Sequence, residues 1–157
     1  MKAIHSMIAA LGLAFVQPAP ANAAVTDPEV IIYRFPGVID NGGGTFTGVA
    51  TLFICTNFSG APETIRFATR GSGGGLITNI PLSIDHLQTR KAATHGPMSY
   101  GADILLNTPG VFGGTTAIAA TSINIICTGM AINASTEAPV GVALRGIRFN
   151  PVPGSQE

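Results

Sequence analysis

The amino-acid sequence predicts an all-β protein, a single-domain antiparallel β-sandwich. After residue 24 the chain is rich in threonine, glycine and β-branched residues, which form short runs with little helical periodicity. Clusters of glycine, proline and asparagine separate these runs at fairly even spacing. Regularly spaced short strands of this kind are typical of sandwiches. The strand order stays open between an immunoglobulin-like and a jelly-roll-like arrangement.

The first 23 residues have the pattern of a secretory signal peptide. Lys2 precedes an apolar run at 7–16 that is too short to span a bilayer. Ala21-Asn22-Ala23 then supplies the small residues that a signal peptidase recognises. We therefore expect cleavage after Ala23 and a secreted or periplasmic protein. The short alanine-rich leader is typical of bacteria.

Cleavage would leave 134 residues, enough for one domain. We expect residues 24–150 to form the sandwich and 151–157 to be an exposed C-terminal tail, because Pro151 and Pro153 cannot continue a strand. No later apolar run approaches the length of a membrane span. No membrane span is therefore expected after cleavage.

Alternating apolar and polar residues predict the strands along the chain. Residues 46–56 are apolar on both faces, as in a central strand that is covered on both sides. In residues 63–70, Ile65 and Phe67 share one face and polar residues occupy the other, which predicts a half-buried strand. Weaker runs are 30–35, 76–84, 85–89, 102–106 and 115–121.

The two cysteines predict one disulfide. Cys55 and Cys127 both stand in the context Ile-Cys-Thr, and in 123–128 the residues Ile123, Ile125 and Cys127 share the inward face. An even pair of cysteines in an exported protein most often forms a disulfide. We expect it to link two facing strands across the core, as an intersheet bond. Closing this loop would stabilise the fold by about 4 kcal/mol.

The last apolar run changes phase. Val142 and Leu144 share one parity, whereas Ile147 and Phe149 share the other. One extra residue near Arg145-Gly146 would return both sets to the core, so we predict a bulge or bend there.

Composition and motifs exclude several classes of function. Seven basic residues against eight acidic ones after the leader leave a net charge near −1, so nucleic-acid binding is not expected. The chain lacks Gly-x-Ser-x-Gly, and the stretch 71–75 is better interpreted as a turn than as a nucleophile or phosphate loop. We expect no enzymatic activity and no cofactor.

Metal-ligating residues are few after the leader. His86 and His95 could combine with Asp85 or Asp103, and Met98 could add a soft ligand, but the spacing matches no known ligand pattern. The segment 40–44 offers too few carboxylates for calcium. No metal site is predicted, although a small periplasmic metal-binding protein stays open as an alternative.

The densest group of functional side chains on a predicted loop lies in residues 94–100. We select His95, Met98 and Tyr100 as a tentative ligand-contact loop. Binding residues concentrate on loops that a rigid scaffold positions. The leading hypothesis is an exported, non-enzymatic binding or surface-interaction module whose partner is a protein or a surface glycan.

The alternative hypothesis is a structural subunit that assembles by β-strand addition. The apolar run 30–35 lies near the mature N-terminus and could pair with another chain through an edge strand. The composition, with no Trp and one cysteine pair, is similar to that of fimbrial subunits. Pro151 and Pro153 stand where such subunits generally have a strand.

Overall fold

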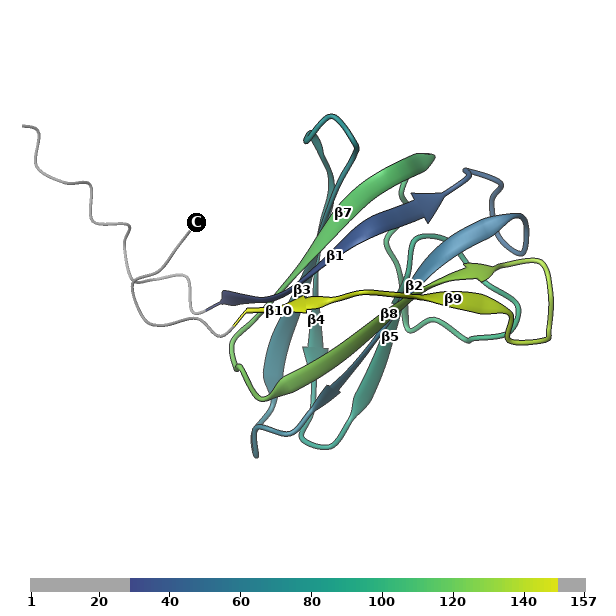
Figure 1. The fold of residues 1–157 in the computed structure, drawn as a ribbon. Coiled ribbons are helices and arrows are strands. Elements are labelled where there is room, and N and C mark those ends of the chain that lie inside the picture. The colour runs from purple at the N-terminus through teal and green to yellow at the C-terminus, as the bar shows by residue number, and fades with distance from the viewer. Residues whose placement is uncertain (1–28, 150–157) are drawn as a thin grey trace, which may run out of the picture.

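The computed structural model describes residues 29–149, which form a β-sandwich of two five-stranded sheets (Figure 1). The all-β sandwich predicted from the sequence is confirmed. The predicted signal peptide and C-terminal tail lie outside the described residues. Within the described part of the chain, no helix is long and apolar enough to cross a membrane.

The first sheet has the order β10-β1-β7-β3-β4 and the second β6-β5-β2-β8-β9. Neighbouring strands are antiparallel except β5 and β6. β1 pairs with β7 in one sheet, and the strands that follow them, β2 and β8, pair in the other. The bounds are β1 Val30–Asp40, β2 Val49–Asn57, β3 Glu63–Arg70, β4 Leu76–Ile84, β5 Thr89–Ala93, β6 Ile104–Leu105, β7 Val111–Ala120, β8 Ile125–Asn133, β9 Gly141–Leu144 and β10 Ile147–Arg148.

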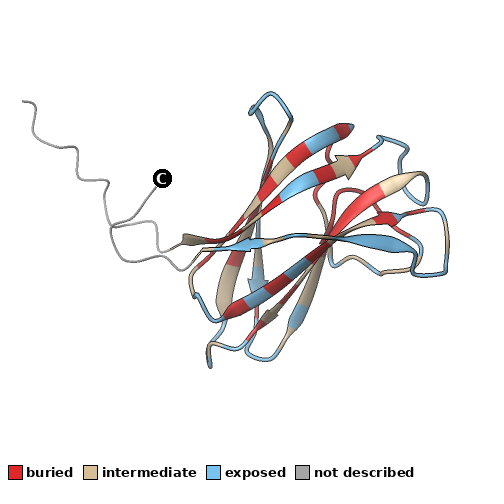
Figure 2. Ribbon diagram, in the orientation of Figure 1, coloured by how far each residue is buried: buried red, intermediate tan, exposed pale blue. Residues whose placement is uncertain are grey.

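The main core lies between the two sheets, where buried residues alternate along the strands (Figure 2). The ring of Phe53 from the second sheet lies 5.4 Å from Phe35 and 5.9 Å from Phe67, both of the first sheet. Ile65 and Phe67 are fully buried, as their alternation in 63–70 predicts. Aromatic contacts of this kind add to the burial of apolar area that joins the layers.

A second, smaller core covers the outer face of the second sheet. Ala50 and Leu52 of β2 are buried there, and Tyr100 and Ala102 from the loop between β5 and β6 pack against this cluster. The expectation that 46–56 contains a central strand covered on both faces is therefore confirmed. The chain between β5 and β6 is the cover.

The disulfide between Cys55 and Cys127 is present, with Cα atoms 4.1 Å apart. The prediction that it joins the two sheets is wrong, because the two residues lie directly opposite each other on β2 and β8, neighbours in one sheet. Both residues are buried. The alternation of apolar and polar residues correctly predicted that both cysteines face inward. It could not distinguish a bond between the two sheets from a bond between neighbouring strands of one sheet. In immunoglobulin domains the corresponding bond links the sheets.

Three further expectations are corrected. Residues 30–35 do not form an edge strand, because β1 lies between β7, with which it pairs along its length, and β10, with which it pairs at Tyr33 and Arg34. Ile123 is 43% exposed rather than inward, since β8 begins two residues later. Residues 85–88 form a turn, whereas the predicted strand at 76–84 coincides with β4.

The phase change near Gly146 is a bend at which the chain changes sheets. β9 pairs with β8, and β10 pairs with β1, so the extended yellow segment in Figure 1 belongs to both sheets in turn. The prediction that both apolar sets return to the core is confirmed for Leu144, which packs against the main core, and wrong for Val142 and Ile147, which are 72% and 52% exposed. Both strands lie at sheet edges.

Candidate functional site

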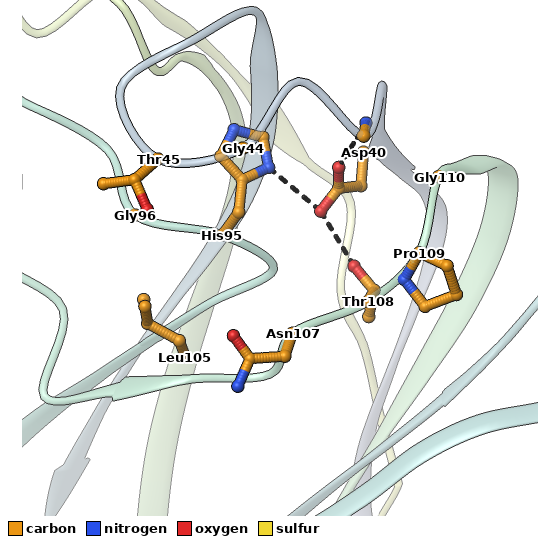
Figure 3. A pocket seen from close by; sticks show the side chains of 11 residues that line it. Asp40, Gly44, Thr45, His95, Gly96, Leu105, Asn107, Thr108, Pro109 and Gly110 are labelled. Atoms are coloured by element: carbon orange, nitrogen blue, oxygen red, sulfur yellow. Dashed lines mark hydrogen bonds and ion pairs between the residues drawn. The ribbon is translucent and has the colours of Figure 1, made fainter.

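One end of the sandwich carries an open hollow of about 560 Å³, formed where three connecting segments meet (Figure 3). The segments are 41–48 between β1 and β2, 94–97 after β5, and 106–110 before β7. Glycine and proline are frequent in all three, which lets their backbones turn sharply. The lining residues are Asp40, Gly42, Gly44, Thr45, His95, Gly96, Leu105, Asn107, Thr108, Pro109 and Gly110.

The carboxylate of Asp40, the last residue of β1, connects the three segments. It is fully buried. Oδ1 accepts a hydrogen bond from the Gly42 amide at 2.7 Å, and Oδ2 accepts one from the Thr108 hydroxyl at 2.8 Å. Oδ2 also lies 3.0 Å from Nδ1 of His95. A buried carboxylate is tolerated only when such partners replace its hydration.

The surroundings of Asp40 favour its ionised form. Burial alone raises the pKa of the carboxyl group. The contact with His95 lowers the pKa, as do hydrogen bonds from the Gly42 amide and from the side chains of Thr108 and Thr94. Together the lowering contacts exceed the effect of burial, so the pKa lies below the usual value of 3.8. Asp40 is therefore a carboxylate at neutral pH.

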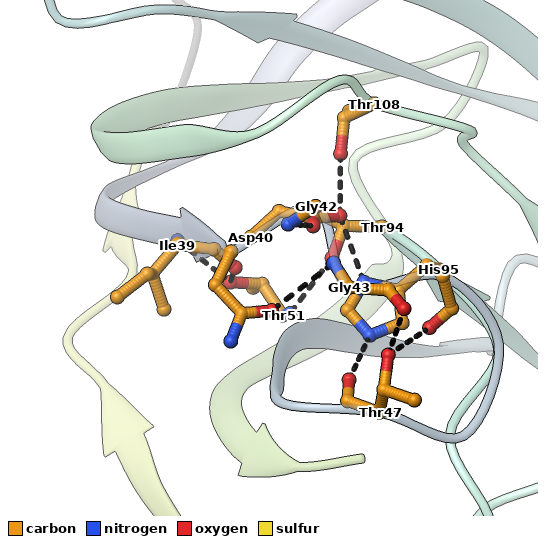
Figure 4. Close-up of polar contacts among 11 residues, drawn as sticks. Ile39, Asp40, Gly42, Gly43, Thr47, Thr51, Thr94, His95 and Thr108 are labelled. Atoms are coloured by element: carbon orange, nitrogen blue, oxygen red, sulfur yellow. Dashed lines mark hydrogen bonds and ion pairs between the residues drawn. The ribbon is translucent and has the colours of Figure 1, made fainter.

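His95 is held on both sides of its ring (Figure 4). Nδ1 lies 3.0 Å from Oδ2 of Asp40 without forming an aligned hydrogen bond. Nε2 lies 2.9 Å from the backbone oxygen of Thr47. The side chain is 10% exposed. The ring thus joins the end of β1 to the loop 41–48.

The polar network continues beneath the hollow through two threonines. Thr94 accepts a hydrogen bond from the amide of Thr51 at 2.9 Å. The hydroxyl of Thr51 in turn donates to the oxygen of Ile39 at 2.8 Å and accepts from its amide at 2.9 Å. Both threonines are fully buried. The network therefore fixes β5 and β2 to the end of β1.

Two residues around the hollow adopt an uncommon backbone conformation. Phe46 has φ of 63° and Asn107 has φ of 47°, both in the left-handed region. This region is costly for a bulky residue such as phenylalanine, whereas asparagine tolerates it. Phe46 is 52% exposed. Such strain is concentrated at ligand-contacting and switching segments of proteins.

The pair of Asp40 and His95 resembles the orienting half of a Ser-His-Asp triad only in part. In a triad the second ring nitrogen faces a nucleophile and accepts its proton. Here Nε2 faces the carbonyl oxygen of Thr47, which has no proton to give. The arrangement holds the end of β1, the loop 41–48 and the segment 94–97 together.

The structure brings one of the three predicted contact residues into the hollow. His95 lines it. Met98 is 43% exposed and its amide donates to Ala134, while Tyr100 packs on the second core. Sequence reasoning did not select Asp40 as a contact residue, because no local pattern relates it to a histidine 55 positions away. Its position at a strand end, before a glycine-rich turn, was the available signal.

The candidate metal ligands do not come together. His86 lies in the turn before β5 and accepts a hydrogen bond from the Gly60 amide, whereas His95 follows the other end of β5. Asp103 lies 3.7 Å from Arg90. Among residues 29–149, no three of the His, Cys, Asp and Glu side chains gather as a metal site would require. The glycine-rich stretch 71–75 is a turn between β3 and β4.

Comparison of this chain with models of protein families, with curated proteins and with solved structures gave no match in any of the three.

Proposed function

We propose that the protein is an exported, non-enzymatic binding module that recognises its partner with the loop end around Asp40 and His95. The leader-like residues 1–23 support export, with cleavage after Ala23. The observation that carries the binding role is the hollow itself, whose three segments are fixed from below by a buried polar network. Preorganised loops on a rigid scaffold are suited to recognition, because little order is lost on binding.

The chemistry of the lining favours a neutral, polar partner. The Asp40 carboxylate is buried and turned onto Gly42, Thr108 and His95, so it does not present an unpaired charge to the hollow. The rest of the lining supplies glycine backbone, the hydroxyl of Thr45 and the amide of Asn107. Hydroxyl-rich glycans and neutral protein loops match such groups through hydrogen bonds. A surface glycan or a protein surface is therefore the partner we propose.

A binding screen with residue-level detection tests this function. We would apply neutral glycans from an array to the ¹⁵N-labelled mature protein and follow amide shifts. Shifts concentrated in 41–48, 94–97 and 106–110, weakened by Asn107→Gly, would support the proposal. Glycine keeps the positive φ at this position while removing the amide side chain. The matched control is Asn124→Gly, in the exposed loop between β7 and β8. Binding that maps only elsewhere would reject the site.

Strand addition remains a second candidate, with a different strand from the one first expected. β4 is a nine-residue edge strand without a charged side chain, and long uncharged edges can pair with other chains. Pro81 is a protective feature of this edge. Light scattering after size-exclusion chromatography tests this candidate. A concentration-dependent oligomer that Asn79→Lys dissolves would favour it over the binding module.

Export is tested separately. Fractionation of the native host and the intact mass of the product report both location and cleavage. A mass beginning at Ala24 in the periplasm or medium is expected, whereas a full-length cytosolic product would refute export.

A further inference from the structure

We propose that His95 is a pH-responsive latch, which holds the loop 41–48 against the hollow when the ring is doubly protonated and releases it when the ring loses a proton. The loop would respond in this way with or without a bound ligand. The pH would then control whether the loop 41–48 is held against the hollow.

The latch follows from what the two ring nitrogens face. Nδ1 lies 3.0 Å from a carboxylate oxygen of Asp40, and Nε2 lies 2.9 Å from the carbonyl oxygen of Thr47. Both of these groups can only accept protons in hydrogen bonds. A neutral histidine carries one N–H, so it can satisfy one of them. Only the imidazolium carries a proton on both nitrogens.

The contact with Thr47 is the one that deprotonation removes. Keeping the proton on Nδ1 preserves the favourable contact with the negative charge of Asp40, whereas losing it would set a lone pair against a carboxylate. Nε2 would then present a lone pair to the oxygen of Thr47, and two acceptors at this distance repel. Asp40 stays bound to Gly42 and Thr108 in either state.

Among the described residues that line the hollow, Asp40 is the one titratable side chain beside the ring. The neighbouring segment 134–140, which is bonded to Gly48 and Met98, carries Glu137, and that side chain is exposed and does not line the hollow. The segments 41–48, 94–97 and 106–110 contain none besides His95. Asp103, further along the chain, contacts Arg90 and the amide of Lys91 instead. The response therefore belongs to one group.

The middle of the loop 41–48 is poised to respond, because it is exposed and contains a strained residue beside the His95 contact. Residues 41–47 are all exposed. Besides the His95 contact, the amide of Phe46 donates to Gly96 at 2.8 Å, and the amide of Asn41 donates to Val49 at 3.2 Å. At its two ends the loop is also held by the Gly42 amide, which donates to Asp40 at 2.7 Å, and by the Gly48 oxygen, which accepts from the Ala134 amide at 2.8 Å. Phe46 itself has a positive φ, which is unfavourable for a bulky residue. Loss of the Thr47 contact leaves the Phe46 amide bond to Gly96 to oppose this strain in the middle of the loop.

The test is a pH titration of the labelled full domain by NMR between pH 5 and 8, the range in which histidines titrate. The Cε1–H signal of His95 reports its protonation, and the amides of Phe46 and Thr47 report the loop. We expect both to change with one midpoint. The protection of the Phe46 amide, corrected for intrinsic exchange, should fall about tenfold at high pH, as for loss of one charge-assisted hydrogen bond.

Two variants make the test specific. In His95→Gln the loop amides should not depend on pH over this range. In the matched control His86→Gln, which changes an exposed histidine outside the hollow, they should titrate as in the unaltered protein. The proposal is overturned if the ring of His95 titrates without a change in the loop, if it does not titrate in this range, or if the loop of His95→Gln still responds.

Discussion

Asp40 illustrates how one side chain can organise a whole end of a sandwich. Its two oxygens take contacts from the following turn, from the segment before β7 and from His95. Because the carboxylate is fully buried, none of these partners can be replaced by bulk water without opening the loops. The relative positions of the three loop segments therefore depend on Asp40 more than on contacts within any one segment.

Replacing Asp40 by Asn tests this role. The variant removes the charge that pairs with buried His95, so we expect it to lower the free energy of unfolding by about 3 kcal/mol at pH 7. The folded pKa of Asp40 lies below the unfolded value, so its contribution is complete above that unfolded value. The contribution is lost as the pH falls through the folded pKa.

The measurement is thermal unfolding by circular dichroism from pH 3 to 7. The difference in melting temperature between the unaltered protein and Asp40→Asn should become smaller toward pH 3. Asp85→Asn, in an exposed turn, is the matched control and should show no such convergence. A gap that stays constant over the whole range would contradict the assignment.

At this scale the sequence predicted His95 as a contact residue but not its environment. Side-chain chemistry is visible in the sequence, and a histidine on a loop is a reasonable candidate. The identity of its partners depends on which strand ends meet, and Asp40, Thr47 and Thr108 are brought together only by the sheet pairing.

At the scale of elements, alternation predicted strands well where one face is solvated. The strands at 63–70 and 76–84 coincide with β3 and β4, because turn residues bound them clearly. Alternation failed where the chain leaves one sheet for the other, since the phase change at Gly146 has the same pattern as a bulge. Pairing partners are long-range information that a local period does not contain.

The change of sheet at Gly146 gives a test at this scale. A Cβ on Gly146 would lie 2.4 Å from Cε1 of Phe35, a buried core ring that cannot easily move. We expect Gly146→Ala to lower the free energy of unfolding by about 2 kcal/mol through overpacking. Urea denaturation would measure it.

Gly73→Ala is the matched control, because nothing lies within 4 Å of its added Cβ in an exposed turn. Its stability should stay within about 0.5 kcal/mol of the unaltered protein. Equal effects of the two substitutions would show that Gly146 does not need its close approach to Phe35.

For the whole molecule, the disulfide and the apolar core act on different interfaces. The disulfide connects β2 to β8 within one sheet, while Phe35, Phe53 and Phe67 hold the two sheets together. The sequence predicted the sandwich and the bond correctly, because both depend on the kinds of residue present. It could not place the bond, since two inward cysteines are compatible with either geometry.

Removing the bond by Cys55→Ala with Cys127→Ala should destabilise the protein by about 4 kcal/mol, through the added entropy of the unfolded chain. Thermal unfolding with and without reductant measures the effect. The double variant is its own control, because a reductant has no further bond to break in residues 29–149. Equal melting temperatures of the oxidised protein and the double variant would refute the prediction.

The position of the bond also determines how the molecule would yield under tension. The described chain begins at β1 and ends at β10, and these strands are neighbours in the sheet that lacks the bond. A pull on the two termini would first separate the short contact between them. Extension would then stop at Cys55 and Cys127, so the 72-residue span that they close would never be stretched. Tension could thus extend only the described segments outside the two cysteines, 29–54 and 128–149.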